Sequence, residues 1–244
     1  MIASLPMYER PGTRDVHDRL WTLIRTHLGY GPHALTRGEN LADLWRSPDL
    51  LLSQSCSLPF RLSLHEHLDI VASPIHDLPC EPGYYFSVLV VRHDERRSAV
   101  TEFAQARIAV NAFDSHSGWA ALPAELRATA PLLTGSHAAS VQAVADGRAD
   151  LASIDAVTWG LLEPEGLTGG LRVLDTTAST PALPYVTRRG NDIQALRNAL
   201  ELAIAALSDA DRKMLNLLGV SYVPTEEYLS LPIPVEACQM PVNP

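Results

Sequence analysis

The stretch Thr-Gly-Ser-His-Ala-Ala-Ser-Val-Gln-Ala-Val-Ala-Asp-Gly-Arg-Ala-Asp-Leu-Ala-Ser-Ile-Asp, residues 134–155, decides the fold. Ser136 is a typical residue for the start of a helix, and small apolar residues recur after it with helical spacing. We therefore predict a helix over 136–145. Gly147 stops that helix, and 150–154 is expected to be a buried strand. A helix that leads directly into a strand indicates an α/β fold.

The same alternation extends to both sides of this stretch. Residues 107–111 predict a strand, followed by a helix over 115–128 that bends near Pro123. The other predicted strands lie at 2–7, 50–53, 69–72, 84–91, 171–174 and 184–187, and the other predicted helices lie at 16–28, 158–162, 193–207 and 209–218. Strands that alternate with helices predict parallel sheets covered by helices on both faces.

Two extended segments, near 84–91 and 183–188, bracket a self-contained α/β block. We therefore expect an α/β protein of two lobes, each a sheet flanked by helices. The predicted first lobe is discontinuous and comprises 1–86 plus 187–244. The predicted second lobe, 87–186, is inserted into it.

Composition narrows the class of protein. The 244 residues carry a formal net charge of −9 and no basic stripe, which argues against nucleic acid as a partner. No apolar run approaches the ~20 residues of a membrane span, so we expect no membrane insertion. The N-terminus lacks the features of a secretory signal. We therefore expect a cytoplasmic protein as the sequence stands, or a periplasmic one if a leader was removed.

The cysteines and histidines give little signal for a disulfide framework or a metal. Cys56, Cys80 and Cys238 make an odd number without metal-site spacing, although Cys56 and Cys80 could pair in an oxidising compartment. His65-Glu66-His67, with His76, is a local cluster that lacks a third ligand at a suitable spacing. We expect no metal and no other cofactor.

Two predicted helix starts combine small and polar residues. One is Ser115-His116-Ser117-Gly118, and the other is Gly135-Ser136-His137. The first turn of a helix presents unpaired N–H groups and the positive end of the helix dipole, which together favour an anion. The sequence therefore predicts a site for a small oxyanion at these two starts. Each motif alone is also compatible with plain helix capping.

Three segments resemble the phosphate/phosphite/phosphonate-binding family of ABC-transporter solute receptors. They are Arg-Ile-Ala-Val-Asn-Ala-Phe-Asp-Ser-His-Ser-Gly at 107–118, the stretch 134–155, and Leu-Pro-Tyr-Val-Thr at 183–187. The likeness spans about 84–190 and is weaker elsewhere. It implies a type II periplasmic-binding fold that closes on a phosphate- or phosphonate-like solute in an interlobe cleft. It also implies an ABC permease as a partner.

The resemblance implies roles for individual residues. Ser115, Ser117 and Gly118 would bind oxyanion oxygens, His137 would donate a hydrogen bond, and Asp155 would accept one. His116 stands where the family more often has a small residue, and we include it among the ligand-binding residues. From the first lobe and the crossing segments we add Tyr8, Gln54, Ser55 and Tyr85. Asp155 is equally suited to capping the next helix, and Tyr8 to packing.

An enzyme on the same fold is the alternative function. Cytoplasmic proteins of this architecture include lyases, and His116, His137 and Asp155 could supply acid–base chemistry in a lyase- or dehydratase-like reaction. A sensor domain is a third possibility. The sequence shows no nucleophile elbow, P-loop or dinucleotide fingerprint. We therefore favour binding without turnover and assign no catalytic residue.

Overall fold

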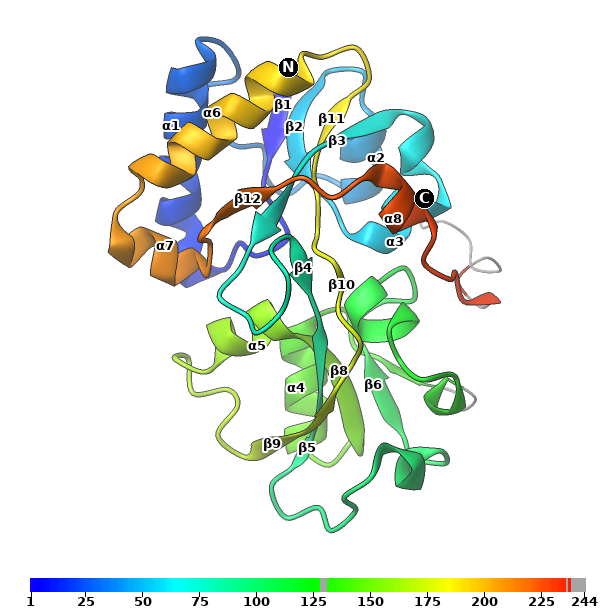
Figure 1. Cartoon of the computed structure of the whole chain (residues 1–244). Helices are drawn as coiled ribbons and strands as arrows, with labels where there is room; N and C mark the ends of the chain where they lie inside the picture. The colour runs from blue at the N-terminus through cyan, green and yellow to red at the C-terminus, as the bar shows by residue number, and fades with distance from the viewer. Residues whose placement is uncertain (128–130, 236, 238–244) are drawn as a thin grey trace. The chain divides into compact units, whose positions relative to one another are not determined.

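The computed structural model describes residues 1–127, 131–235 and 237, and it splits into two compact units. Unit 1 comprises Met1–Tyr84 and Pro181–Leu231, and unit 2 comprises Tyr85–Thr180 together with the described residues from Pro232 onward. Both units contain a mixed sheet flanked by helices, so the predicted α/β class is correct (Figure 1). The lobe boundaries predicted from the sequence, 1–86 plus 187–244 and 87–186, remain a proposal.

Unit 1 is built on a five-stranded sheet of order β1-β2-β11-β3-β12. Its strands are β1 (Ile2–Ser4), β2 (Leu50–Gln54), β11 (Tyr185–Arg188), β3 (Leu68–Ile75) and β12 (Gly219–Ser221). Its helices are α1 (Arg14–Leu28), α2 (Leu41–Arg46), α3 (Ser57–Leu62), α6 (Ile193–Ala206), α7 (Asp209–Leu215) and α8 (Thr225–Leu229). Single 3-10 turns lie at Pro11–Thr13 and Leu64–Glu66.

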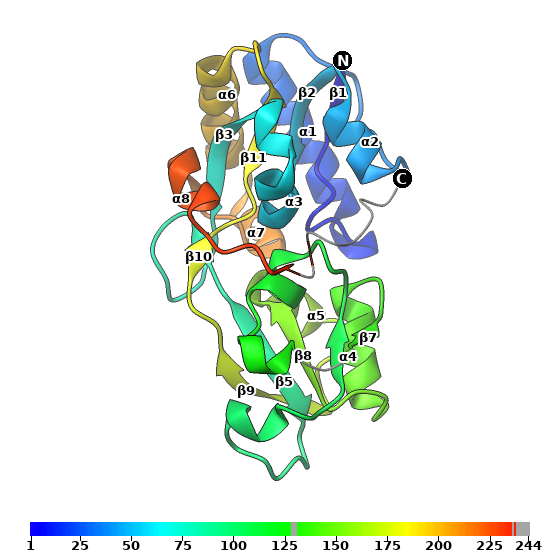
Figure 2. The same cartoon turned by 90° about the vertical axis from the view of Figure 1, so that its right-hand side faces the viewer.

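Both faces of this sheet are covered. α1 and α6 pack on one face, where Trp21, Ile24 and Leu200 are buried in a common core with strand residues (Figure 1). α2, α3 and α8 cover the other face, where Phe60 and Tyr228 are buried (Figure 2). The apolar faces of these helices follow from their sequence spacing, because residues three and four apart share one side of a helix.

Unit 2 is built on a second five-stranded sheet, of order β7-β6-β8-β5-β9. Its strands are β5 (Ser87–Arg92), β6 (Ile108–Val110), β7 (Leu132–Leu133), β8 (Leu151–Asp155) and β9 (Leu171–Thr176). Its regular helices are α4 (His137–Ala145) and α5 (Ala156–Leu162). Short helical segments lie at Val100–Phe103, His116–Ala120 and Ala124–Leu126, and Phe103, Trp119 and Leu126 from them are buried against β5, β6 and β8.

Neither sheet is wholly parallel, so the expectation of parallel sheets is wrong. β1 pairs with β2 in parallel, and β6 pairs in parallel with β7 and β8. β11 runs antiparallel to β2 and β3, and β5 runs antiparallel to β8 and β9. The reason is topological: β5 follows the first crossing of the chain and β11 follows the second, so neither belongs to a simple strand–helix–strand repeat.

The two segments that cross between the units pair with each other. β4 (Tyr84–Tyr85) and β10 (Thr180–Pro181) form a separate two-stranded sheet. The outward and the returning chain are therefore joined by main-chain hydrogen bonds where one unit gives way to the other.

The long helix expected over 115–128 is wrong. His116–Ala120 is a π-helix, in which the N–H of Ala120 donates to Ser115 O at 3.1 Å and the N–H of Ala121 donates to His116 O at 2.8 Å. The regular helix cannot continue, because Pro123 has no N–H to donate. Residues 128–130 lie outside the described part of the chain. Wide turns of this kind occur often at functional sites.

Within the described residues, the helices are all too short or too polar to cross a membrane.

Candidate functional site

The two helix starts singled out in the sequence lie side by side in unit 2. β6 ends at Val110, and the chain then turns through Asn111 into the π-helix. The N–H of Thr134 donates to Val110 O at 2.9 Å, and the N–H of Gly135 donates to Asn111 O at 3.0 Å. These two bonds hold the start of α4 against the start of the π-helix, at the carboxyl end of β6. Ligands of open α/β sheets bind at this edge.

Hydroxyl and amide groups of both starts form one connected set. Ser115 caps the π-helix by accepting a hydrogen bond from the N–H of Gly118 at 3.1 Å. The hydroxyls of Ser115 and Ser117 are 3.5 Å apart. Ser117 Oγ lies 2.9 Å from Nε2 of His137, the first residue of α4. The structure therefore brings four of the predicted residues together, as hydrogen-bonding groups suited to oxyanion oxygens.

Two further serines fix the main chain of Ser117. Ser153 Oγ donates to Ser117 O at 2.5 Å, and Ser87 Oγ donates to the same oxygen at 3.1 Å. Ser87 and Ser153 lie on the neighbouring strands β5 and β8, and all three serines are buried. The C=O of Ser117 and the N–H of Gly118 belong to one peptide group and point in opposite directions. Because the two hydroxyls fix the C=O, they also fix the direction of the N–H. The serines thus orient the peptide group that faces Ser115.

Gly118 is required by a close approach of the chain. A Cβ atom built at this position would lie 1.7 Å from Oδ1 of Asn111 and 3.3 Å from Ser115 Oγ. Asn111 Oδ1 is itself buried, and it has no hydrogen-bond partner in the described part of the chain. Only glycine fits here, because any side chain would displace Asn111.

His137 is neutral at physiological pH. Burial of its imidazole lowers the pKa to about 4, and the main chain of Ser153 raises the pKa only in part. Nδ1 is buried, and Nε2 faces Ser117. The imidazole therefore adds no charge to the site, and its contact with a ligand stays a prediction.

His116 and Asp155 make structural contacts in addition to their predicted role. His116 is 4% exposed, its Nε2 lies 3.1 Å from Thr180 Oγ1, and its ring lies 6.3 Å from that of Tyr85. His116 thereby links the π-helix to residues of β4 and β10. Asp155 ends β8 and caps α5 by accepting a hydrogen bond from the N–H of Thr158 at 3.0 Å. Contact of His116, Tyr85 and Asp155 with a ligand stays a prediction.

The three predicted residues of unit 1 are all buried. Tyr8 and Gln54 line a pocket of about 20 Å³. The Gln54 amide donates to Leu183 O at 3.1 Å. Ser55 is fully buried, and its hydroxyl has no hydrogen-bond partner in the described residues. The predicted contact of these three side chains with a ligand stays a prediction.

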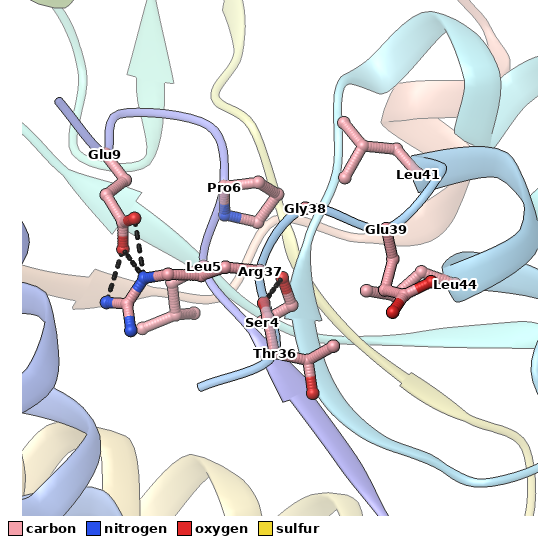
Figure 3. A pocket seen from close by; sticks show the side chains of 10 residues that line it. All are labelled: Ser4, Leu5, Pro6, Glu9, Thr36, Arg37, Gly38, Glu39, Leu41 and Leu44. Atoms are coloured by element: carbon pink, nitrogen blue, oxygen red, sulfur yellow. Dashed lines mark hydrogen bonds and ion pairs between the residues drawn. The ribbon is translucent and has the colours of Figure 1, made fainter. Parts of the chain in front are cut away.

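A larger pocket of about 140 Å³ lies elsewhere in unit 1 (Figure 3). Glu9 and Arg37 face each other on one side of it, joined by hydrogen bonds of 2.7–2.9 Å, and Arg37 also contacts Asp18 at 2.8 Å. Glu39 lies on the opposite side. The guanidinium is thus already engaged by two carboxylates, and we assign this pocket no ligand.

A metal centre has no support among the described residues, which hold no group of three or more His, Cys, Asp or Glu side chains suited to a metal ion. In the suspected cluster, the Nδ1 atoms of His65 and His76 contact the main-chain oxygens of Phe60 and Asn216. Cys56 and Cys80 are thiols, and Cys238 lies outside the described residues.

Asn111, Ser87 and Ser153 take part in the site and were missed by sequence reasoning. Each had a weak signal in the sequence. Asn111 is the polar residue that ends an apolar strand, and Ser153 is a polar residue inside one, two positions before Asp155. Side chains two apart on a strand share a face, so Ser153 could have been grouped with Asp155.

Comparison with known proteins identifies the family. Residues 65–225 match the family described as the periplasmic substrate-binding protein of a phosphonate ABC transporter. A search of curated proteins finds no match to this sequence.

Solved structures share the fold at low sequence identity. A binding-protein component of an ABC phosphonate transporter from Pseudomonas aeruginosa is 15% identical, with a TM-score of 0.69 over 91% of this chain and 81% of that one. PhnD1 of Prochlorococcus marinus, in complex with methylphosphonate, is 17% identical, with a TM-score of 0.68 over 93% and 94%. A Xanthomonas citri protein bound to ATP is 15% identical, with a TM-score of 0.64 over 95% and 94%.

The fold is therefore that of the two-lobed periplasmic binding proteins, as expected. Because the family match covers most of the sequence, the assignment goes further. The chain belongs to the periplasmic substrate-binding proteins of phosphonate ABC transporters.

Proposed function

We propose that the chain binds a small phosphorus oxyanion, of the phosphate or phosphonate class, at the paired helix starts of unit 2 and delivers it to an ABC permease. The connected set formed by Ser115, Ser117, Gly118 and His137 is the observation that supports this proposal most strongly. Membership of the family supports both the ligand class and the permease.

The chemistry of the site suits an oxyanion. Its hydrogen-bonding groups are two hydroxyls, a neutral imidazole and the N-terminal turn of α4, which carries the positive end of the helix dipole. A ligand oxygen bound there would accept hydrogen bonds from neutral donors. Such charge-assisted bonds are about twice as strong as bonds between neutral groups.

Calorimetric titration with phosphate, phosphite, methylphosphonate and acetate tests the ligand class. We expect saturable binding of at least one phosphorus oxyanion and much weaker binding of acetate, which has fewer oxygens to accept hydrogen bonds from the two helix starts. Binding of none of the four would overturn the proposal. Conversion of a bound ligand to product would instead favour the lyase-like alternative.

Ser117→Ala tests the place of binding. The variant removes a hydroxyl from the centre of the set, and a hydrogen bond to a charged group contributes about 1.5–3 kcal/mol. We therefore expect affinity to fall by about 10- to 150-fold in calorimetry. Ser98→Ala is the matched control, because Ser98 is exposed and none of its contacts involves the site. Equal affinities of the two variants would place the ligand elsewhere.

A further inference from the structure

The small pocket of unit 1 has a mostly apolar lining that includes a few polar side chains. It has a volume of about 20 Å³ and is lined by Leu5, Tyr8, His17, Leu20, Gln54, His76, Tyr185, Leu215 and Leu217. A cavity needs about 10–15 Å³ to hold one water molecule, so a single small group fits. Every lining residue belongs to unit 1, whereas the residues of the oxyanion site proposed above belong to unit 2.

His76 supplies a buried acceptor that lacks a donor. Its side chain is 6% exposed, and Nδ1 lies 2.6 Å from Asn216 O. A carbonyl oxygen can only accept, so Nδ1 carries the hydrogen and Nε2 of the neutral ring is an acceptor. Nε2 is buried and has no hydrogen-bond partner in the described residues. A buried acceptor without a hydrogen bond destabilises the folded protein, so we expect a donor in the pocket.

Two other lining residues also present acceptors. Nδ1 of His17 lies 2.9 Å from Thr13 O, which assigns the hydrogen to Nδ1 and leaves Nε2 as an acceptor by the same reasoning. The amide nitrogen of Gln54 donates to Leu183 O, so its Oε1 is the remaining polar atom. His17 and Gln54 thus carry acceptor atoms as His76 does, and a group that donates hydrogen bonds suits these three lining residues.

A cation is the wrong donor for this pocket. Burial lowers the pKa of His76 to about 4 and also lowers that of His17, so the site already disfavours positive charge on its own side chains. The carboxylates of Glu9 and Asp18 raise the pKa of His17 electrostatically, without a hydrogen bond to it. Both carboxylates form ion pairs with Arg37. Moving a charged group from water into a buried pocket costs free energy, and a neutral donor avoids most of this cost.

We propose that the pocket binds one neutral hydrogen-bond donor of about the size of water, which donates to Nε2 of His76. The donor is a hydroxyl, supplied either by an ordered water molecule or by a small alcohol-bearing solute. Tyr185 also lines the pocket, and its hydroxyl can donate to or accept from the bound hydroxyl.

Long-range ¹H–¹⁵N NMR of the full chain tests the acceptor directly. We expect His76 in the tautomer protonated at Nδ1, with an Nε2 shift typical of an accepted hydrogen bond. His65 is the internal control, because its Nδ1 also contacts a carbonyl, Phe60 O at 3.1 Å, while the residue is only partly buried. A proton on Nε2 of His76, or an Nε2 shift typical of a ring without a partner, would overturn the proposal.

Oxygen-17 magnetic relaxation dispersion tests the occupant. We expect His76→Phe, which keeps a ring against Tyr8 but removes the acceptor, to lose one long-lived water relative to wild type and to His65→Phe. No loss would rule out water. A crystal structure of protein refolded from denaturant in solute-free buffer then separates the sources: a lone water peak beside Nε2 indicates solvent. Larger density that is present before refolding and lost after it indicates a solute hydroxyl.

Two results would contradict the proposal whatever the variant does. One is an empty pocket in a high-resolution crystal structure. The other is a change of the His76 resonances on addition of Zn²⁺ alone, which would show that the acceptors bind a metal ion instead of a neutral donor.

Discussion

At the scale of single residues, Gly118 and Asn111 show how closely the proposed oxyanion site is packed. Oδ1 of Asn111 occupies the space that a side chain at position 118 would need. The same asparagine accepts the N–H of Gly135 through its main-chain oxygen. One residue therefore sets both the close approach and the contact between the two helix starts.

Gly118→Ala should damage both folding and binding. The new methyl group would meet Asn111 Oδ1, and a substitution that overpacks a site of this kind destabilises by about 1–3 kcal/mol. We expect a lower midpoint in urea denaturation and weaker oxyanion binding. Gly160→Ala is the matched control, since nothing lies within 4 Å of a Cβ atom there, and alanine in α5 should stabilise slightly.

The double variant Asn111→Ala/Gly118→Ala separates the clash from other effects. Removing the asparagine amide frees the space, so we expect the midpoint to recover part of the loss seen in Gly118→Ala. If the midpoint of the double variant falls by the sum of the falls in Asn111→Ala and Gly118→Ala, the clash is not the cause of the destabilisation.

At the scale of elements, β8 acts on the site through the π-helix. Ser153 on β8 and Ser87 on β5 both donate to Ser117 O, so the sheet orients the peptide group between Ser117 and Gly118. Chains of hydrogen bonds strengthen one another in a buried setting. The strands therefore affect the donors at the helix start without contacting a ligand.

Ser153→Ala should weaken oxyanion binding without a direct contact being lost. One of the two donors to Ser117 O disappears, and a net hydrogen bond contributes about 0.5–1.5 kcal/mol. We expect affinity to fall by about 2- to 12-fold in calorimetry, with a shift of the Gly118 amide resonance in NMR. A normal affinity together with a shifted amide would show that this orientation is unimportant for binding.

The sequence predicts regular elements well and their interruptions poorly. α4, β8 and α6 are recognisable because small or apolar residues recur in them with a fixed period or in an unbroken run, and Gly147 follows α4 closely. The π-helix at His116–Ala120 could not be predicted, because it results from tertiary contacts of Ser117 and from Pro123 further along. The short helices α2, α3 and α8 were also missed, since five or six residues carry too little periodicity.

The candidate site could be predicted only in part, for a related reason. Ser115, Ser117, Gly118 and His137 lie in motifs with a local physical meaning, namely helix starts that present N–H groups. Ser87 and Ser153 join them only through sheet pairing, which a single sequence does not reveal. Buried polar side chains inside apolar strands were the available signal.

At the scale of the whole molecule, buried histidines couple stability to pH. The pKa of His76 is about 4 in the folded protein, whereas an unfolded histidine titrates near ~6.5. Between these values the unfolded chain binds a proton that the folded chain does not. The stabilisation is thus fully present above about pH 7 and is lost as the pH falls toward 4.

We expect His76 alone to lower the free energy of unfolding by about 2 kcal/mol between about pH 7 and pH 5. Urea denaturation at the two pH values measures this fall. His76→Phe should reduce it, while His65→Phe should leave it unchanged. The same fall in His76→Phe as in wild type would show that His76 carries no such coupling.

The paired strands β4 and β10 have a consequence for how the gene can be cut and rejoined. Most of unit 2, Tyr85–Thr180, is one uninterrupted stretch of coding sequence, and its two ends lie in strands that pair with each other. Such a stretch can be exchanged as a cassette, because a replacement needs only ends that meet in the same way. Recombination at these two points would give a protein a new oxyanion-binding half while leaving the reading frame and core of the host half intact.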